Sequence, residues 1–144
     1  MQKAVQRGLR AGALAGLLLV GLFFADYGPA TTLSTVARWF ALDGNAWSKL
    51  IGAILLVIVG AVFGGLFGIA LRSRSLSLSQ SVLVGLATGL GFWIVLVLLL
   101  STAIRHIEQS LYGMLFWLVT SLLYGLVLGS LYGTFQKQEG AREL

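Results

Sequence analysis

The fold of this chain follows from the stretch Ser121-Leu-Leu-Tyr-Gly-Leu-Val-Leu-Gly-Ser-Leu-Tyr-Gly133, close to the C-terminus. Its glycines recur at every fourth position, so on an α-helix they form a narrow ridge along one face. A ridge without side chains lets the backbone of a second helix approach closely, which is how helices associate in a lipid bilayer. Three other apolar segments carry similar ridges. The predicted helix-packing residues are Gly12, Gly16, Gly60, Gly64, Gly68, Gly85, Gly89, Gly125, Gly129 and Gly133.

The composition is that of an integral membrane protein. Of the 144 residues, 58% are hydrophobic and only 10% are charged, which is too apolar for an ordinary soluble domain. The chain has 19 glycines, one proline and no cysteine, so disulfides and thiolate metal sites are absent. The net charge of +5 comes from residues at the ends of the apolar segments. We therefore expect the lipid bilayer and other transmembrane helices as partners, in a homo- or hetero-oligomer, and no nucleic acid.

Four apolar segments are long enough to cross a hydrocarbon core of about 30 Å. We expect an all-α integral membrane protein with transmembrane helices at about residues 8–27, 50–71, 81–104 and 111–135. They form a single membrane domain, 1–144, which ends in a polar tail at 136–144. Ser77 and Gln80 have the spacing of a capping box at the start of the third helix.

The first connection, at about residues 30–43, predicts a short amphipathic helix in the membrane interface. In this helix Trp39 lies beside the apolar face, and we expect Trp39 and Trp47 at the level of the lipid headgroups. The alternative is a plain loop with two anchoring tryptophans. The residues of the apolar face are Leu33, Val36, Ala37 and Phe40.

The distribution of basic residues predicts the orientation. If the N-terminus is cytoplasmic, seven basic residues lie on the cytoplasmic side and three on the other, which agrees with the positive-inside rule. We expect both termini in the cytoplasm. The apolar, glycine-rich C-terminal helix is typical of small bacterial four-helix membrane proteins, so we expect the bacterial inner membrane. The cytoplasmic set is Lys3, Arg7, Arg10, Arg72, Arg74, Lys137 and Arg142, and the outer set is Arg38, Lys49 and Arg105.

The glycine pattern also predicts an internal repeat. The first helices of the two halves correspond at an offset of 73 residues, from Gly12 to Gly85 (85 − 12). The second helices correspond at an offset of 65, from Gly60 to Gly125 (125 − 60). Each half contains two helices and enters the membrane from the same side, so the repeat is parallel, with its pseudo-two-fold axis along the membrane normal. A chance resemblance between two glycine-rich segments is the alternative.

In all four helices the glycine ridges lie mainly toward the predicted cytoplasmic side, whereas the outer halves carry bulky side chains. The bundle should therefore taper, and its outer half could enclose a lipid-filled crevice or offer a docking surface. Trp93 and Trp117 continue the glycine ridges outward and are the candidate docking residues. In the alternative they fill the outer half of the chain's own bundle.

Side chains that could carry chemistry are sparse. No charged residue or histidine lies inside a predicted spanning core, which argues against a proton-coupled transporter. We expect the hydroxyls near the midplane to bond to helix carbonyls rather than to line a pore. No catalytic motif is present, so we expect no enzyme, no cofactor and no metal. His106, the only histidine, could bind a cofactor, but a solvated histidine is the favoured alternative. The hydroxyl residues are Thr88, Thr120, Ser121 and Tyr124.

Two classes of function fit these features. In the first, the chain is an accessory or structural subunit whose glycine faces and outer tryptophans pack against other helices of a larger membrane complex. In the second, it is a small homo-oligomeric transporter or channel, or a binder of lipid or another hydrophobic ligand, that uses the cleft between its two repeats. The absence of charges from the spanning cores favours the first class.

Overall fold

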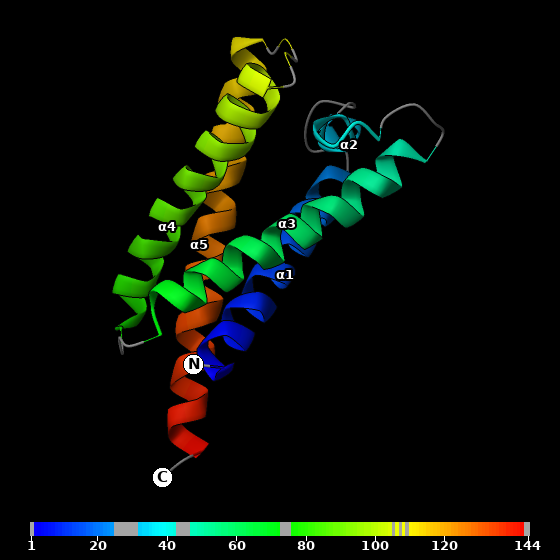
Figure 1. Cartoon of the computed structure of the whole chain (residues 1–144). Helices are drawn as coiled ribbons and strands as arrows, with labels where there is room; N and C mark the ends of the chain where they lie inside the picture. The colour runs from blue at the N-terminus through cyan, green and yellow to red at the C-terminus, as the bar shows by residue number, and fades with distance from the viewer. Residues whose placement is uncertain are drawn as a thin grey trace.

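The computed structural model describes residues 2–24, 32–42, 47–72, 76–104, 106, 108 and 110–142. Four of its helical segments are long and apolar enough to cross a membrane, which confirms the prediction of an all-α protein with four such helices. The elements in chain order are α1 (Gln2–Phe24), α2 (Thr32–Trp39), α3 (Ser48–Ala70), α4 (Leu78–Trp93), the π-helical η1 (Ile94–Ile104) and α5 (Leu111–Arg142) (Figure 1).

The backbones of α1 and α3 are in direct contact. A Cβ atom added to Gly12 would lie 2.8 Å from the Cα atom of Gly64 and would overlap the carbonyl oxygen of Gly60. The approach is reciprocal, since a Cβ on Gly64 would lie 2.7 Å from the Cα of Gly12. Cβ atoms essentially never come within 3.0 Å of another heavy atom in this way, so only glycine fits at these positions.

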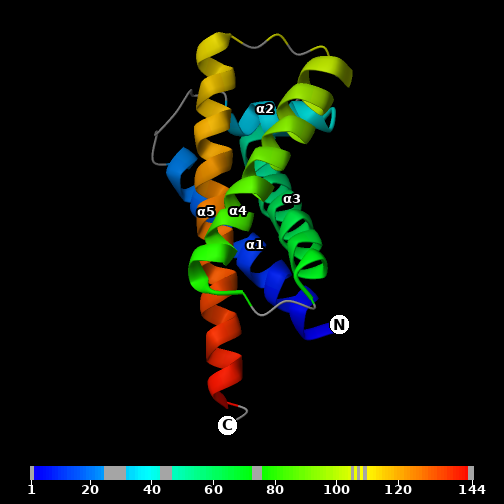
Figure 2. The same ribbon diagram turned by 90° about the vertical axis from the view of Figure 1, so that its left-hand side faces the viewer.

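α4 and α5 contact each other in the same way. A Cβ on Gly85 would lie 2.8 Å from the Cα of Gly129 and would overlap the carbonyl oxygen of Gly125. These three residues are the counterparts of Gly12, Gly64 and Gly60 at the two offsets found in the sequence. The two helical pairs therefore pack in the same register. Figure 2 shows α4 along α5 and α1 along α3.

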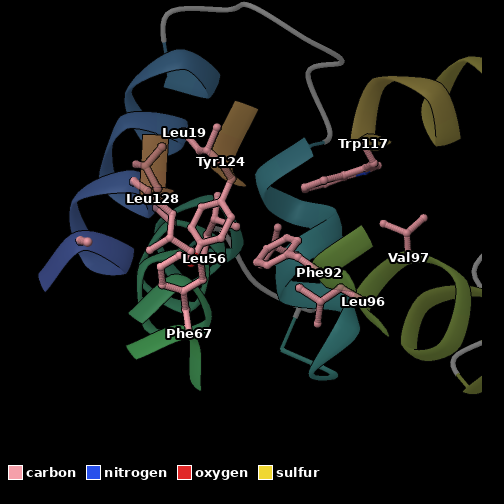
Figure 3. Packing of buried hydrophobic residues seen from close by; sticks show 14 of the residues in the cluster. Leu19, Leu56, Phe67, Phe92, Leu96, Val97, Trp117, Tyr124 and Leu128 are labelled. Carbon is pink, nitrogen blue, oxygen red and sulfur yellow. The ribbon is translucent and has the colours of Figure 1, made fainter. Parts of the chain in front are cut away.

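Aromatic side chains fill the space between the two pairs. Phe92 of α4 contacts Phe63 of α3 and Tyr124 of α5, with 5.0 Å between ring centroids in each case. Phe67 and Tyr132 meet edge to face at 5.1 Å. Figure 3 shows Tyr124 and Phe92 among the aliphatic side chains of this core. The two contacts between the pairs differ in extent: α1 lies along α5, whereas α3 touches α4 only over a small region.

The short helix α2 packs on the protein, and Trp39 is buried together with its apolar face. Its Leu33, Val36 and Ala37 are buried as the apolar pattern predicted, but Trp39 is also buried, at 2% exposure. Its ring lies 4.9 Å from that of Trp117 in α5, so Trp39 packs inside the protein, and its level in the membrane stays a prediction. Phe40, predicted on the apolar face, follows the end of the helix and is 40% exposed.

Gly52 of α3 allows this position of α2. A Cβ on Gly52 would overlap the carbonyl oxygen of Leu33, so the backbone of α2 rests directly on α3. Trp47, at the start of α3, is 67% exposed, as expected for an interfacial tryptophan.

Most predicted helix boundaries agree with the structure, and the boundaries that differ from the prediction lie near the two ends of the chain. The capping box before α4 is confirmed, because the Ser77 hydroxyl accepts from the Gln80 amide nitrogen and the Gln80 side chain accepts from the Ser77 nitrogen. α1 begins at Gln2 rather than at residue 8, and residues 25–27 of the predicted span lie outside the described part. The expected polar tail is helical up to residue 142, and its Glu139 pairs with Arg7 of α1. α1 begins and α5 ends at the same end of the bundle (Figures 1 and 2).

Candidate functional site

The described residues contain no group of three or more histidine, aspartate or glutamate side chains that could hold a metal ion. His106 lies exposed in the connection between η1 and α5, in a left-handed conformation with φ of 50°. No group of metal ligands includes it among the described residues, and a ligand role for His106 stays a prediction.

Three of the four predicted midplane hydroxyls bond to backbone carbonyls. The fourth, Ser121, does not follow the prediction, because its hydroxyl is buried without a hydrogen-bond partner in the described part of the chain. Thr88 donates to the carbonyl of Val84 at 3.0 Å, and Thr120 donates to that of Phe116 at 2.7 Å, in both cases one turn earlier in the same helix. The Tyr124 hydroxyl reaches across to α3 and donates to the carbonyl oxygen of Gly60 at 2.5 Å. For these three residues the prediction of structural hydrogen bonds is confirmed.

The predicted helix-packing glycines all face the interior of the chain. Each of the ten is buried, and the atoms nearest to an added Cβ belong to another helix of the same chain. These ridges are therefore occupied by contacts within the monomer and form no part of its outer surface.

The two candidate docking tryptophans also pack against their own chain. Trp117 is only 4% exposed and contacts Phe23 at 5.8 Å in addition to Trp39. Trp93 is partly buried, and its indole nitrogen donates to the carbonyl oxygen of Met114 at 3.1 Å. These contacts correspond to the alternative in which both tryptophans fill the chain's own bundle.

An apolar groove of about 590 Å³ lies between α1 and α5, the pair of helices that joins the two halves. Tyr124 lies on its floor, since that side chain is buried. Gly21 leaves open space in the wall of the groove, because a Cβ at this position would have no neighbour within 4 Å. Leu17, at 57% exposure, is typical of the aliphatic walls. The lining residues are Leu14, Ala15, Leu17, Leu18, Leu19, Gly21, Leu22, Leu123, Tyr124, Val127 and Leu131.

A smaller polar hollow of about 200 Å³ lies between the same two helices, toward the end where the chain termini lie. Arg7 donates to the carboxylate of Glu139 at 2.5 Å, and its guanidinium carbon lies 5.3 Å from the ring centroid of Tyr132. The Arg7 side chain is 12% exposed and that of Glu139 is 41% exposed. The remaining lining residues are Arg10, Phe135 and Gln138.

Helical spacing connects the polar hollow to the apolar groove. On α1, Arg10 is followed on the same face by Leu14, Leu17 and Gly21, at steps of three or four residues. On α5, residues 123, 127, 131, 135 and 138 have the same spacing and belong to the linings of the two cavities. The two cavities therefore follow one seam along α1 and α5, which is apolar within the membrane span and polar at the end that carries the termini.

Sequence reasoning named a cleft between the two repeats, but it did not place that cleft between α1 and α5, and it missed the role of Gly52. Gly52 is a single glycine without the four-residue repeat that marked the other contacts. The seam depends on which of the four helices lie side by side, and the glycine ridges alone do not contain that information. One signal was available, namely the spacing of Arg7 and Arg10 on the same face as the leucines that follow them.

Comparison with known proteins gives a family. The model of a family of unknown function, DUF6789, matches residues 2–143 of the chain, which is nearly its whole length. No curated protein and no solved structure matches it.

Proposed function

We propose that this chain, which belongs to the family of unknown function DUF6789, is a non-catalytic membrane protein that binds a membrane lipid between its two helical pairs. The groove between α1 and α5 carries the proposal. Its volume of about 590 Å³ and its aliphatic lining suit an acyl chain, and ligand sites in helix bundles are commonly found between helices.

An accessory subunit, the other candidate, receives less support from the geometry. An accessory subunit would dock onto other helices through its glycine faces and outer tryptophans. The glycines pack against the chain itself, and Trp117 is buried beneath α2. A channel is also less favoured, because the hydroxyls of Thr88, Thr120 and Tyr124 bond to backbone carbonyls.

The proposed arrangement in the membrane is a parallel repeat with both termini in the cytoplasm. The common register of Gly12 with Gly60 and of Gly85 with Gly125 supports the repeat. The common end at which α1 begins and α5 ends supports termini on one side (Figure 1). The excess of basic residues on that side, seven against three, supports a cytoplasmic location in the bacterial inner membrane.

Photochemical labelling tests the lipid site. The protein is reconstituted into phosphatidylcholine vesicles that contain a trace of phospholipid with a photoactivatable acyl chain, and the labelled peptides are mapped by mass spectrometry. The exposed face of α3 supplies an internal reference for bulk lipid, since Ile54, Ile58 and Val62 are each more than half exposed. We expect stronger labelling of residues 14–22 and 123–131 than of this reference face.

Two glycines that have open space beside them provide matched variants. Gly21→Phe places a ring in the groove and should reduce the groove labelling to the level of the α3 reference. Gly91→Phe adds the same ring in α4, where a Cβ also has no neighbour within 4 Å, and should leave the groove labelling unchanged. Equal labelling of groove and reference in the unmodified protein would refute the proposed function.

A further inference from the structure

We infer that the ligand of this groove is an anionic phospholipid from the leaflet at the end that carries the termini, with its phosphate at Arg10 and Gln138. This inference rests on the proposed lipid site and specifies the headgroup. Its basis is the juxtaposition, on one seam between α1 and α5, of a basic hollow and an apolar groove.

The dimensions of the seam match one leaflet. From Arg10 to Gly21, at the far part of the groove, α1 rises by about 16 Å. Half of a hydrocarbon core of about 30 Å is about 15 Å. A lipid whose phosphate lies beside Arg10 can therefore extend one acyl chain along the whole groove without leaving its own leaflet.

The charge of the polar hollow favours an anion. Arg7 is paired with Glu139, so that these two charges compensate each other. Arg10 is exposed and forms no ion pair with any other residue that the structure describes. The five lining residues contain two arginines and one glutamate, which leaves one positive charge beside the amide of Gln138.

The chemistry of these two side chains suits a phosphodiester. A guanidinium can bind two phosphate oxygens at once through a planar pair of N–H groups. The Gln138 amide can donate to a further oxygen or to a headgroup hydroxyl. A zwitterionic lipid would bring its own cation close to Arg10, whereas a headgroup without a cation, such as that of phosphatidylglycerol, avoids this repulsion.

Arg7 has a separate role as a positioning residue. Its guanidinium is largely buried, lies over the Tyr132 ring and pairs with Glu139, so it holds the first turns of α1 against the last turns of α5. Because Arg10 is one turn further along α1, this contact fixes the position of Arg10 next to Gln138.

The test compares two photoactivatable lipids that have the same acyl chains and differ in the headgroup, phosphatidylglycerol and phosphatidylcholine. Each is added in trace amounts to the same host vesicles. One basic residue near a membrane surface favours an anionic lipid by about fivefold. We expect about this ratio for labelling of residues 14–22 and 123–131, and a ratio near one at the exposed face of α3.

The variant Arg10→Gln should reduce the groove ratio to about one, and Gln138→Ala should reduce it by a smaller factor. Lys49→Gln is the matched control, since it removes one exposed positive charge at the other end of the bundle and should retain the full ratio. Circular dichroism of each variant reports whether the fold is retained.

The possible failures are distinguishable. Enhanced groove labelling that is equal for the two headgroups, or unaffected by Arg10→Gln, would overturn this inference and leave the lipid site in place. Absence of enhanced groove labelling with either lipid would overturn both proposals. Binding of inorganic phosphate at Arg10 in detergent, without any preference for phosphatidylglycerol in vesicles, would assign the hollow to a free anion.

Discussion

The substitution Gly85→Ala should separate α4 from α5. The added Cβ would lie 2.8 Å from the Cα of Gly129, whereas non-bonded carbon atoms prefer about 3.5–4.0 Å. The two backbones must therefore move apart by about 1 Å, because neither obstructing group is a side chain that can rotate away. Overpacking of this kind costs up to about 3 kcal/mol. Alanine recovers about 1 kcal/mol of helix propensity, so we expect a net loss of about 2 kcal/mol.

Two further alanine variants make this prediction specific. Gly91→Ala lies in the same helix, and its Cβ meets no atom within 4 Å, so it should be neutral or stabilising by up to about 1 kcal/mol. Gly12→Ala produces the same 2.8 Å approach in the other helical pair and should lose as much stability as Gly85→Ala.

Reversible unfolding in mixed micelles of dodecyl maltoside and sodium dodecyl sulfate, followed by circular dichroism, measures these differences. The decisive quantity is the gap in unfolding free energy between Gly85→Ala and Gly91→Ala, which should be about 2–3 kcal/mol. If the two variants are equally stable, the backbone contact between α4 and α5 does not hold the pair together and the reasoning is wrong.

Three other predictions concern α2, its C-terminus and the contact between the helical pairs. Trp39→Ala should destabilise the protein by about 3 kcal/mol, as for other buried aromatic residues, whereas Trp47→Ala should change the same unfolding free energy by less than about 0.5 kcal/mol. Ala41→Gly should stabilise by about 0.5–1 kcal/mol in that assay, because Ala41 adopts a left-handed φ of 59° where glycine carries no Cβ penalty; a loss of stability would contradict this. Glu139→Gln should cost about 1 kcal/mol at low salt and less at high salt, since it removes the partly exposed pair with Arg7, and an effect independent of salt would count against the ion pair.

The four spanning helices could be predicted because their causes are local in the sequence. Glycine at every fourth position marks a close contact, and the spacing of Ser77 and Gln80 marks the start of α4. For Gly12 and Gly85, the offset between the halves was sufficient to indicate equivalent positions, and the structure gives them equivalent neighbours.

The position of α2 could not be predicted, for a physical reason. An amphipathic pattern such as that of Leu33, Val36 and Ala37 shows that one face is apolar, but lipid and protein are both apolar surroundings. Trp39 is compatible with either environment, since its amphipathic ring is as common at the interface as in a core. α2 packs on α3 through its contact with Gly52. In a sequence with 19 glycines, a single glycine outside the four-residue pattern does not indicate such a contact.

The candidate site required knowledge of which helices are neighbours. Arg10 and Gln138 are far apart in the sequence and belong to different halves of the predicted repeat. They line one hollow because α1 lies along α5. The corresponding helices α3 and α4 are in contact over a smaller region. Phe63 and Phe92 meet between α3 and α4, and the difference between the two helix contacts departs from an exact two-fold relation.

The most direct test of the lipid site is the measurement of nuclear Overhauser effects between lipid chains and protein methyl groups in bicelles that contain phosphatidylglycerol. The protein is deuterated except for its methyl groups, and lipid methylene protons are the source of magnetisation. We predict stronger effects at Leu18 and Val127, in the groove, than at Ile58 and Val62, on the exposed face of α3. Equal effects at the methyl groups of all four residues, or effects at the groove from a second protein chain in place of lipid, would contradict the account.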